Sequence, residues 1–308
     1  MNKKRPRSVV SILDLTTNEI ESLMNTADDI EANPEKYSSK CAGKILSTIF
    51  FEPSTRTRLS FESAMLSLGG SVISTPDSQS SSAAKGESVS DTVRVISNYA
   101  DIIAMRHPKE GAPVVAAMRS SVPVINAGDG GHFHPTQTLA DLLTIRRTKG
   151  RLSGLTIGLC GDLMFGRTVH SLIEAMLRYA DNHYLMISPN ELRLPEYIRE
   201  ALDKAGVQWE ETESLEYAIP KLDVLYMTRV QKERFFNEED YIRLKDTYIL
   251  DEEKLKSAKS DLAILHPLPR VNEISVSVDD DERAKYFYQT LCGKQMRMAL
   301  IMLLLGIK

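Results

Sequence analysis

The sequence has few cysteines, and their spacing is that of neither disulfide partners nor metal ligands. Only three occur in 308 residues, and Cys41, Cys160 and Cys292 lie far apart. Disulfides persist in oxidising compartments, and structural zinc sites need several clustered ligands. An odd number of isolated cysteines therefore predicts neither kind of site and favours a reducing, cytoplasmic setting.

Long hydrophobic runs and a strong excess of one charge are also missing. The longest apolar run, Met298 to Ile307, is shorter than the roughly 20 residues that span a bilayer, and is typical of a packed C-terminal helix. No apolar segment follows the basic residues 3–7, so we expect a solvated tail and no secretory signal. The formal net charge of −4 argues against general affinity for nucleic acids or membranes. Any anion site must be a local concentration of arginines.

What the sequence does contain is an alternation of short apolar strands and helical patterns. Thr16 and Glu19 form a capping box before a first amphipathic helix. Helices are predicted at 55–68, 87–99 and 110–119, and a further one from about Pro135. Strands are predicted at 44–50, 71–74, 101–105, 122–126, 155–160, 184–187, 207–209, 224–226 and 262–265. Strands separated by helices predict an α/β fold with two doubly wound parallel sheets.

The length of the chain suits two domains better than one core. The charged joint Lys149-Gly150-Arg151 predicts the boundary. We expect a first domain at residues 1–149, a second at 150–289, and a C-terminal helix at about 290–308 that packs back on the first domain. Ligands of open α/β sheets bind at the carboxyl ends of strands, and every polar motif of this chain directly follows a predicted strand.

The most informative polar segment follows the first predicted strand. Ser54, Thr55, Arg56 and Thr57 would lie at the N-terminus of a helix that Gly69-Gly70 ends. A simple Ser/Thr cap explains one such hydroxyl, but arginines among the hydroxyls favour a phosphate site, because helix amides and guanidinium groups both bind phosphate oxygens. The apolar face predicted for this helix comprises Leu59, Phe61, Ala64, Met65 and Leu68.

This segment also resembles a family signature. The carbamoyl-phosphate signature of the aspartate and ornithine carbamoyltransferase family is similar to Phe50-x-Glu52-x-Ser54-Thr55-Arg56-Thr57. Matching motifs follow in order at the later strand ends, so the resemblance covers nearly the whole chain. It implies carbamoyl transfer by direct attack, with residues 54–57 binding carbamoyl phosphate and Arg56 and Thr57 acting in catalysis.

Two further motifs of the first domain match the family. Arg106 stands at the end of the third strand, and by itself could be an exposed strand-end arginine. The resemblance implies that Arg106 contacts both the phosphate and the carbonyl oxygen of carbamoyl phosphate. His134, Pro135 and Gln137 match an H-P-x-Q motif, which implies that His134 polarises the carbonyl and Gln137 holds the carbamoyl amide.

The histidines of this segment also raise the question of a metal. His132 and His134 form an H-x-H pattern near Asp129, but a third clear ligand is missing. We therefore predict no metal and no cofactor. His134 at a helix N-terminus is better suited to donate to an oxygen that becomes negative.

The polar segment 77–87 contains Ser81 and Lys85 and is by itself typical of a surface loop. In the family the matching loop crosses into the neighbouring subunit's active site. The resemblance therefore implies that Ser81 and Lys85 bind phosphate or aspartate in trans, and that the protein is a homotrimer with shared active sites.

The fifth predicted strand is followed by a segment that nearly matches two nucleotide-binding motifs. Arg167 stands where a phosphate loop needs lysine, and the glycine spacing does not fit G-x-G-x-x-G. What remains is a helix N-terminus that suits an anion. The family resemblance implies that Arg167 binds the α-carboxylate of the amino-acid substrate.

Two later strand ends complete the expected amino-acid site. Arg229 and Gln231 follow the strand at 224–226, and the resemblance implies that they bind the side-chain carboxylate of aspartate. Pro267 and Leu268 follow the strand at 262–265, and their carbonyls are expected to accept from the carbamoyl nitrogen and the attacking amine. We also expect Glu52, Arg167 and Arg234 to form ion pairs when the domains close.

Charge distinguishes the branches of the family. A dicarboxylate needs cations at both ends, which Arg167, Arg229 and Lys85 supply, and Pro267 stands where the ornithine branch has cysteine. Aspartate is therefore the favoured substrate, and ornithine or another amino acid is the alternative. A non-catalytic phosphate or dinucleotide sensor is a third interpretation, although it has no need of arginines on both domains. Residues 228–235 resemble family members that associate with separate regulatory chains.

Overall fold

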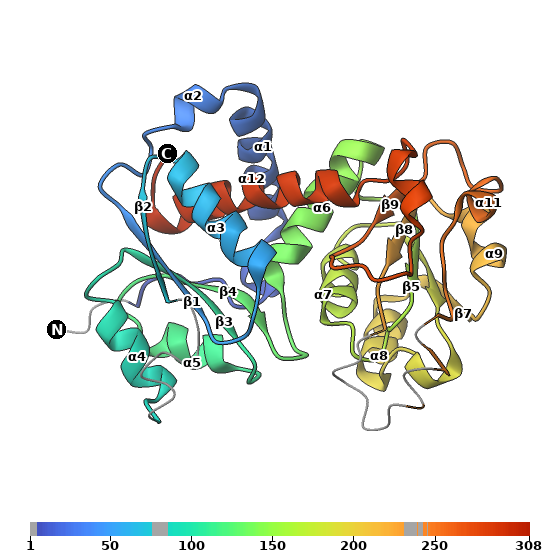
Figure 1. Cartoon of the computed structure of the whole chain (residues 1–308), viewed down its shortest axis with the longest axis horizontal. Helices are drawn as coiled ribbons and strands as arrows, with labels where there is room; N and C mark the ends of the chain where they lie inside the picture. Colours follow the sequence, from blue (N-terminus) through green and yellow to red (C-terminus); the bar gives the residue numbers. More distant parts are fainter. Residues whose placement is uncertain (1–4, 76–85, 231–238, 240–242, 245) are drawn as a thin grey trace. The chain divides into compact units, whose positions relative to one another are not determined.

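The computed structural model describes residues 5–75, 86–230, 239, 243–244 and 246–308 (Figure 1). The chain forms two compact units, each with its own parallel sheet. Unit 1 comprises Met1–Ala140 and Thr290–Lys308, and unit 2 comprises Asp141–Gln289. Helices α6 (Pro135–Lys149) and α12 (Tyr286–Leu305) contribute residues to both units, so two helices join them.

Unit 1 contains a four-stranded parallel sheet in the order β2-β1-β3-β4. Its strands are β1 (Ile45–Phe50), β2 (Ser71–Thr75), β3 (Ile102–His107) and β4 (Val124–Asp129). Its helices are η1 (Ile12–Asp14), α1 (Thr17–Ala32), α2 (Pro34–Tyr37), α3 (Thr55–Ser67), α4 (Val89–Ile96) and α5 (Ala112–Arg119). The predicted α/β fold is confirmed here, although β3 and β4 extend two and three residues beyond their expected ends at 105 and 126.

Helices cover both faces of this sheet. Ile49, Ile103 and Met105 pack with Val93 of α4 and Ala116 of α5 in one apolar cluster. Because side chains alternate along a strand, Thr48 points to the opposite face from Ile49. Thr48 is buried, and its hydroxyl donates to Glu62 of α3 at 3.0 Å. In Figure 1, α4 and α5 accordingly lie across the sheet from α3.

Helix α3 follows its predicted pattern with one exception. Phe61, Ala64, Met65 and Leu68 are buried as expected, but Leu59 is 52% exposed, so its assignment to the apolar face was wrong. Leu59 precedes Phe61 by two residues, a rotation of about 200°, so the two side chains lie on nearly opposite sides of a 3.6-residue helix.

Helix α3 contacts two parts of unit 1 that are distant in sequence, the segment around Ser38 and helix α12. Gly69 follows α3 with φ +77°, a backbone conformation that glycine adopts readily, and a Cβ there would collide with the backbone of Ser38. Arg297 of α12 donates to the Ser60 hydroxyl at 2.9 Å, and its guanidinium lies 5.2 Å from the ring centroid of Phe61. The expected return of the C-terminal helix to the first domain is confirmed.

Unit 2 contains a five-stranded parallel sheet in the order β7-β6-β5-β8-β9. Its strands are β5 (Thr156–Cys160), β6 (His183–Ile187), β7 (Gln208–Thr212), β8 (Val224–Met227) and β9 (Ala263–Leu265). Its helices are α7 (Arg167–Met176), η3 (Asn190–Leu192), α8 (Glu196–Ala205), α9 (Leu215–Ala218), η4 (Ile219–Lys221), α11 (Glu252–Leu255) and η6 (Val276–Asp280).

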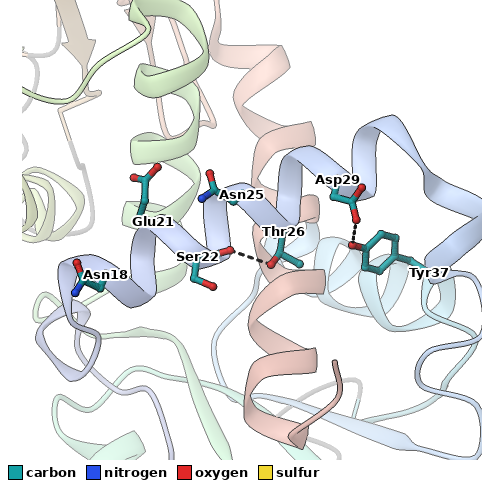
Figure 2. A pocket seen from close by; sticks show the side chains of 7 residues that line it. All are labelled: Asn18, Glu21, Ser22, Asn25, Thr26, Asp29 and Tyr37. Atoms are coloured by element: carbon teal, nitrogen blue, oxygen red, sulfur yellow. Dashed lines mark hydrogen bonds between the residues drawn. The ribbon is translucent and has the colours of Figure 1, made fainter.

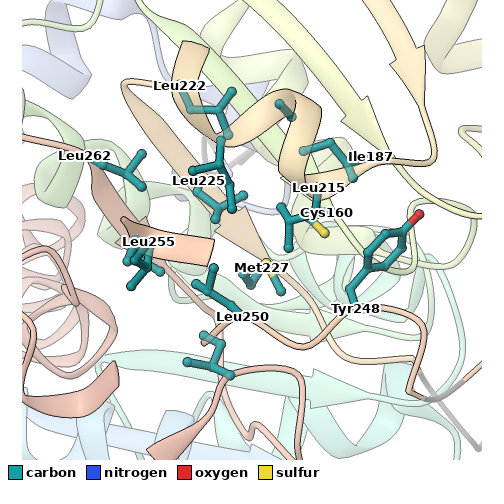
Figure 3. Close-up of a cluster of buried hydrophobic side chains, with 14 of the residues drawn as sticks. Cys160, Ile187, Leu215, Leu222, Leu225, Met227, Tyr248, Leu250, Leu255 and Leu262 are labelled. Carbon is teal, nitrogen blue, oxygen red and sulfur yellow. The ribbon is translucent and has the colours of Figure 1, made fainter. Parts of the chain in front are cut away.

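The core of unit 2 lies between its sheet and the segments that follow β7 and β8. Figure 3 shows Leu225 and Met227 of β8 beside Cys160, with Leu215 of α9 and Leu255 of α11. Tyr226 lies between these two residues of β8 and faces the opposite side of the sheet, where it is fully buried.

Two remaining sequence features have plain structural counterparts. All three cysteines are buried, and none forms a disulfide. None of the helices in the described part of the chain has both the length and the hydrophobicity that a bilayer crossing requires.

Candidate active site

Three segments of unit 1 bring predicted phosphate ligands to one edge of its sheet. β1, β3 and β4 are neighbours and run parallel. Phe50 pairs with Arg106, and His107 pairs with Asp129, so the three strands end at the same edge. The N-terminus of α3, the side chain of Arg106 and the loop after β4 therefore belong to one carboxyl edge, where open α/β sheets bind ligands.

Helix α3 begins at Thr55 without the cap that its sequence could provide. Ser54 occupies the N-cap position, yet its side chain makes no capping hydrogen bond. By contrast, at α1 the Thr16 hydroxyl accepts from Glu19 N at 3.2 Å. The first turn of α3 is thus not closed by its own serine, as expected of a helix N-terminus that receives an anion.

The two arginines of α3 have different surroundings. Arg58 lies in the first turn with its Nε 3.7 Å from Glu62 Oε1, one turn further along the same helix. Arg56 is exposed, and Thr57 beside it is half-buried. Arg56 is therefore the better candidate for a ligand that approaches from solvent.

Arg106 is oriented by Glu52, which follows β1. Arg106 Nε donates to Glu52 Oε2 at 3.0 Å, and the arginine side chain is only 13% exposed. Burial lowers the pKa of Arg106 and Glu52 opposes that shift, so the guanidinium stays charged. Because a guanidinium has five donors, a single bond to Glu52 aims the group without exhausting it.

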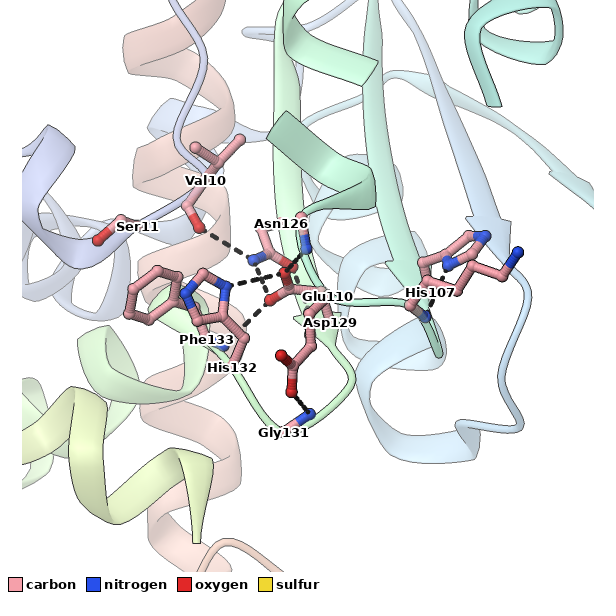
Figure 4. A network of polar contacts seen from close by, with 12 residues as sticks. Val10, Ser11, His107, Glu110, Asn126, Asp129, Gly131, His132 and Phe133 are labelled. Atoms are coloured by element: carbon pink, nitrogen blue, oxygen red, sulfur yellow. Dashed lines mark hydrogen bonds and ion pairs between the residues drawn. The ribbon is translucent and has the colours of Figure 1, made fainter. Parts of the chain in front are cut away.

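A buried carboxylate, Asp129, organises the loop between β4 and α6. Its Oδ1 accepts from Phe133 N at 3.0 Å and from Asn126 Nδ2 at 2.9 Å, and its Oδ2 accepts from Gly111 N at 2.8 Å. Figure 4 shows this network, in which Asn126 also donates to Val10 O at 2.9 Å. A buried carboxylate needs donors in place of water, and these three donors come from β4, the loop after it and the turn before α5. The loop that leads into α6 is therefore fixed.

His134 stands at the end of that loop, immediately before α6, and is 4% exposed. Gln137 N lies 3.3 Å from His134 Nδ1 and donates to it. A ring nitrogen that accepts carries no proton, so the neutral ring is protonated on Nε2. In this tautomer Nε2–H can donate to an oxygen that becomes negative.

His132, two residues earlier, has partners within the loop. His132 Nδ1 lies 3.3 Å from Asp129 Oδ2, and its ring packs on Phe133 with 3.6 Å between centroids. Among the residues that the structure describes, no group of three or more His, Cys, Asp or Glu side chains is arranged to hold a metal ion.

Three segments also meet at the carboxyl edge of the sheet in unit 2. β5, β8 and β9 are parallel neighbours. Arg167 begins α7, which follows β5, and Arg229 lies two residues beyond β8. Pro267 and Leu268 follow β9. The described residues predicted to bind the amino acid thus share one edge.

The segments after β5 and β8 are fastened to each other. Thr228 N donates to Cys160 O at 2.8 Å, and the Thr228 hydroxyl accepts from Asp162 N at 3.1 Å. Gly161 between them has φ +116°, and a Cβ there would collide with Thr228. Asp162 Oδ1 also accepts from Phe165 N at 2.9 Å, which fixes the turn ahead of α7.

His266 builds the turn after β9. Leu268 N donates to His266 Nδ1 at 2.7 Å, and His266 Nε2 donates to Glu273 Oε1 at 2.6 Å. Val271 N and Asn272 N donate to Glu273 Oε2 at 2.9 and 3.1 Å. Leu268 has φ +55°, which is rare for a residue with a Cβ and persists only where surrounding contacts impose it. These contacts set the direction of the carbonyls in the turn.

The charges of this turn follow from its burial. Burial lowers the pKa of His266, although Glu273 opposes the shift. Burial alone would raise the pKa of Glu273, but the hydrogen bond from His266 and the amide donors outweigh it and lower the pKa. A neutral imidazole that donates to an ionised carboxylate agrees with both directions.

Two domain descriptions match the chain and together span nearly all of it. Residues 7–147 match the aspartate/ornithine carbamoyltransferase carbamoyl-P binding domain, and residues 153–304 match the Asp/Orn binding domain of the same family. The chain belongs to the aspartate/ornithine carbamoyltransferase family.

Individual relatives lie on the aspartate side of this family. The aspartate carbamoyltransferase catalytic subunit of Clostridium acetobutylicum is 64% identical over 302 residues, which cover 98% of each chain. The catalytic subunit of M. jannaschii aspartate transcarbamoylase has 47% identity and a TM-score of 0.90, covering 97% of this chain and 98% of the other. Aspartate transcarbamoylase from Trypanosoma cruzi, solved with carbamoyl phosphate and aspartate, has 36% identity and a TM-score of 0.91, covering 96% of each chain.

Four residues that the family resemblance implicated lie outside the described residues. They are Ser81, Lys85, Gln231 and Arg234. Glu52, which was expected to pair with arginines of the second domain, binds Arg106 of its own unit in this structure.

An open groove on α1 does not compete with these sites. Figure 2 shows that it is lined by Asn18, Glu21, Ser22, Asn25, Thr26, Asp29 and Tyr37. Two of these side chains are carboxylates and none is a cation, so the groove is unsuited to a phosphate or a dicarboxylate.

Sequence reasoning missed the residues that hold the loops in place. Asp162 and Glu273 each accept backbone amides, and each is nearly buried. A carboxylate one or two residues beyond a buried strand, next to glycine, was the available signal for Asp162. No comparable signal marked Glu273, because its partners are set by the path of the turn.

Proposed function

We propose that the protein transfers the carbamoyl group of carbamoyl phosphate to the amino group of L-aspartate, giving N-carbamoyl-L-aspartate and phosphate, in de novo pyrimidine biosynthesis. The observation that carries this proposal is the placement of arginines at the carboxyl edges of both sheets: Arg56 and Arg106 in unit 1, Arg167 and Arg229 in unit 2. A phosphate and a dicarboxylate both need such cations.

Unit 1 is assigned the carbamoyl phosphate. The phosphate would bind the N-terminus of α3 through residues 54–57, and Arg106 would bridge the phosphate and the carbonyl oxygen. His134 would donate from Nε2 to the same oxygen, and Gln137 would hold the carbamoyl amide. Residues 1–149, with the helix at 290–308, form this domain in our assignment.

Unit 2, at residues 150–289, is assigned the aspartate. Arg167 would bind its α-carboxylate, and Arg229 with Gln231 would bind its side-chain carboxylate. The carbonyls of Pro267 and Leu268 would accept from the attacking amine and the carbamoyl nitrogen. The turn built by His266 supports this assignment, because carbonyl acceptors are useful only when the backbone is held in one direction.

The reaction needs donors rather than a nucleophile on the enzyme. The lone pair of the aspartate amine forms a C–N bond to the carbonyl carbon, and the oxyanion is stabilised by Thr57, Arg106 and His134. The C–O bond to phosphate then breaks, and phosphate leaves with the electron pair and accepts the amine proton. Loss of one preorganised donor costs about 3–4 kcal/mol of barrier, so three donors supply a large share of the catalysis.

The active site is proposed to be shared between subunits of a cytoplasmic homotrimer, with Ser81 and Lys85 entering from the neighbour. β2 ends at Thr75 and α4 begins at Val89, so the connection exceeds the roughly two to six residues usual for a βα loop. Mixing Lys85→Ala and Arg56→Ala chains under subunit exchange should restore activity, because some interfaces then carry neither defect. Confirmed hybrids that stay inactive would contradict sharing.

The decisive experiment is a steady-state assay for carbamoylated product with aspartate and ornithine side by side. We expect product with aspartate and at least hundredfold less with ornithine, since both carboxylates of aspartate have cationic partners. Preference for ornithine would move the protein to the other branch. Phosphate binding without turnover on any amine would indicate a binding module instead.

A further inference from the structure

A chain of buried hydrogen bonds runs through unit 2 from helix α6 to the turn after β9. Asp141 Oδ1 accepts from Gln289 Nε2 at 2.6 Å, and Gln289 Oε1 accepts from His266 N at 3.0 Å. His266 in turn holds Leu268 N through Nδ1. Asp141 is fully buried, and Gln289 and His266 are 2% and 1% exposed. Water therefore cannot substitute for any link of this chain.

The same carboxylate also binds strand β8. The Tyr226 hydroxyl donates to Asp141 Oδ2 at 3.0 Å. One oxygen of Asp141 thus connects, through Gln289 and His266, to the turn at Leu268, and the other binds β8.

The direction of each bond in this chain is fixed by Asp141. Both oxygens of Asp141 accept, one from Tyr226 and the other from Gln289, so Gln289 turns its NH₂ group toward Asp141 and its oxygen toward His266 N. The reverse orientation would place the amide NH₂ against His266 N, donor against donor, and the amide oxygen against the Asp141 carboxylate, acceptor against acceptor. A buried polar chain of this kind is costly unless its members are satisfied, and each of these contacts joins one donor to one acceptor.

We propose that Asp141 and Gln289 are positioning residues for the amino-acid site: they fix the backbone of the turn at residues 266–268. Neither is among the residues assigned to substrate. The proposal rests on the proposed function, because it is the assignment of aspartate to these loops that makes their position matter for turnover.

A polarity swap tests the proposal. In Gln289→Glu the new carboxylate still accepts from His266 N but faces the carboxylate of Asp141. The double variant Asp141→Asn/Gln289→Glu reverses donor and acceptor, so that the asparagine NH₂ donates to the glutamate while its oxygen accepts from Tyr226. The double variant keeps the total charge of the pair and satisfies every link again.

We expect Gln289→Glu to raise the aspartate KM by about tenfold or more, with the Kd for inorganic phosphate unchanged, and the double variant to return within about threefold of the wild type. Hydrogen exchange of the peptide that covers residues 266–273 should accelerate in the single variant and slow again in the double. Tyr226→Phe, which removes one donor but leaves Gln289 in place, should raise the aspartate KM by less than about threefold.

Several outcomes would overturn the proposal. A folded Gln289→Glu protein with wild-type aspartate KM and wild-type exchange at 266–273 would leave the pair a role in stability alone. Failure of the double variant to restore either quantity would contradict the donor–acceptor reading. If Gln289→Glu does not fold, Asp141→Asn is measured in its place. The proposal would also be overturned if Asp141→Asn showed wild-type exchange at 266–273 and the double variant did not fold. Exchange is independent of turnover, so an inactive wild-type protein with the expected exchange pattern would refute the proposed function and not the positioning role.

Discussion

Strand β3 of unit 1 and strand β9 of unit 2 lead into the same local turn and use it differently. In each, a His–Pro dipeptide is followed by an amide that donates to the imidazole: Lys109 N to His107 Nδ1 at 2.9 Å, and Leu268 N to His266 Nδ1 at 2.7 Å. Proline offers no N–H, so the ring takes the next amide. In unit 1 the predicted ligand is the side chain of Arg106, ahead of the turn, whereas in unit 2 it is the backbone inside the turn.

The surroundings of the two rings differ accordingly. His107 packs against Phe51 with 4.8 Å between ring centroids, and burial lowers its pKa. His266 instead donates to Glu273 and joins a polar chain that extends to α6. A site that uses a side chain can rest on packing and one ion pair. A site that uses carbonyls needs hydrogen bonds that fix the backbone itself.

The largest expected effect comes from unit 1. Arg106→Ala removes a preorganised donor to both the phosphate and the oxyanion, so kcat/KM should fall by roughly 10²- to 10³-fold. Arg58→Ala is the matched control, because Arg58 belongs to the adjoining helix α3 and lies near Glu62. Initial rates at varied carbamoyl phosphate would measure both variants. Equal losses in the two would mean that net positive charge, and not the position of Arg106, supports catalysis.

A smaller effect is expected in unit 2. Arg229→Ala removes a charge-assisted pair worth about 1.5–3 kcal/mol, so kcat/KM for aspartate should fall tens- to hundredfold. Arg193→Ala serves as control, since Arg193 is 41% exposed and its Nε lies 3.8 Å from Glu211 Oε2. Aspartate titrations at saturating carbamoyl phosphate give the comparison. Wild-type efficiency in Arg229→Ala would refute the assignment of the side-chain carboxylate.

The turn in unit 2 should also make stability depend on pH. The folded pKa of His266 lies below its ordinary value of 6.5, so below about that pH the unfolded chain binds a proton that the folded chain does not. The contribution of His266 to the free energy of unfolding is therefore fully present above pH 6.5. It is lost as the pH falls, by at most about 1.4 kcal/mol per pH unit. Glu273 acts in the same sense below its ordinary value of 4.5, because its folded pKa is also lowered.

His266→Gln removes the histidine contribution and tests this expectation. Its Tm should vary less between pH 7 and about 5.5 than the wild-type Tm does. His183→Gln, at an exposed position on β6, should keep the wild-type pH dependence. Equal slopes for wild type and His266→Gln would show that His266 is protonated to the same extent in both states.

The two regions also differ in how much the sequence could predict. The strands, the helix N-terminus at residues 54–57 and the position of Arg106 at a strand end follow from the local hydrophobic pattern. That pattern is a property of short segments. The turn at Leu268 depends on Gln289, which lies more than twenty residues away and is hydrogen-bonded to His266 N. Nothing local to residues 266–270 encodes that partner. The exposure of Leu59 was also missed, because the prediction followed its apolar side chain and not its angular position on the helix.

The central claim is that unit 1 binds carbamoyl phosphate and unit 2 binds aspartate. Its most direct test is phosphate binding in two variants. Calorimetric titration of inorganic phosphate into wild type, Arg106→Ala and Arg229→Ala separates the two regions without turnover. We predict that Arg106→Ala weakens phosphate binding at least about tenfold, the loss expected for a charge-assisted contact, and that Arg229→Ala keeps the wild-type Kd. Unchanged phosphate binding in Arg106→Ala, or an equal loss in both variants, would contradict this division between the units.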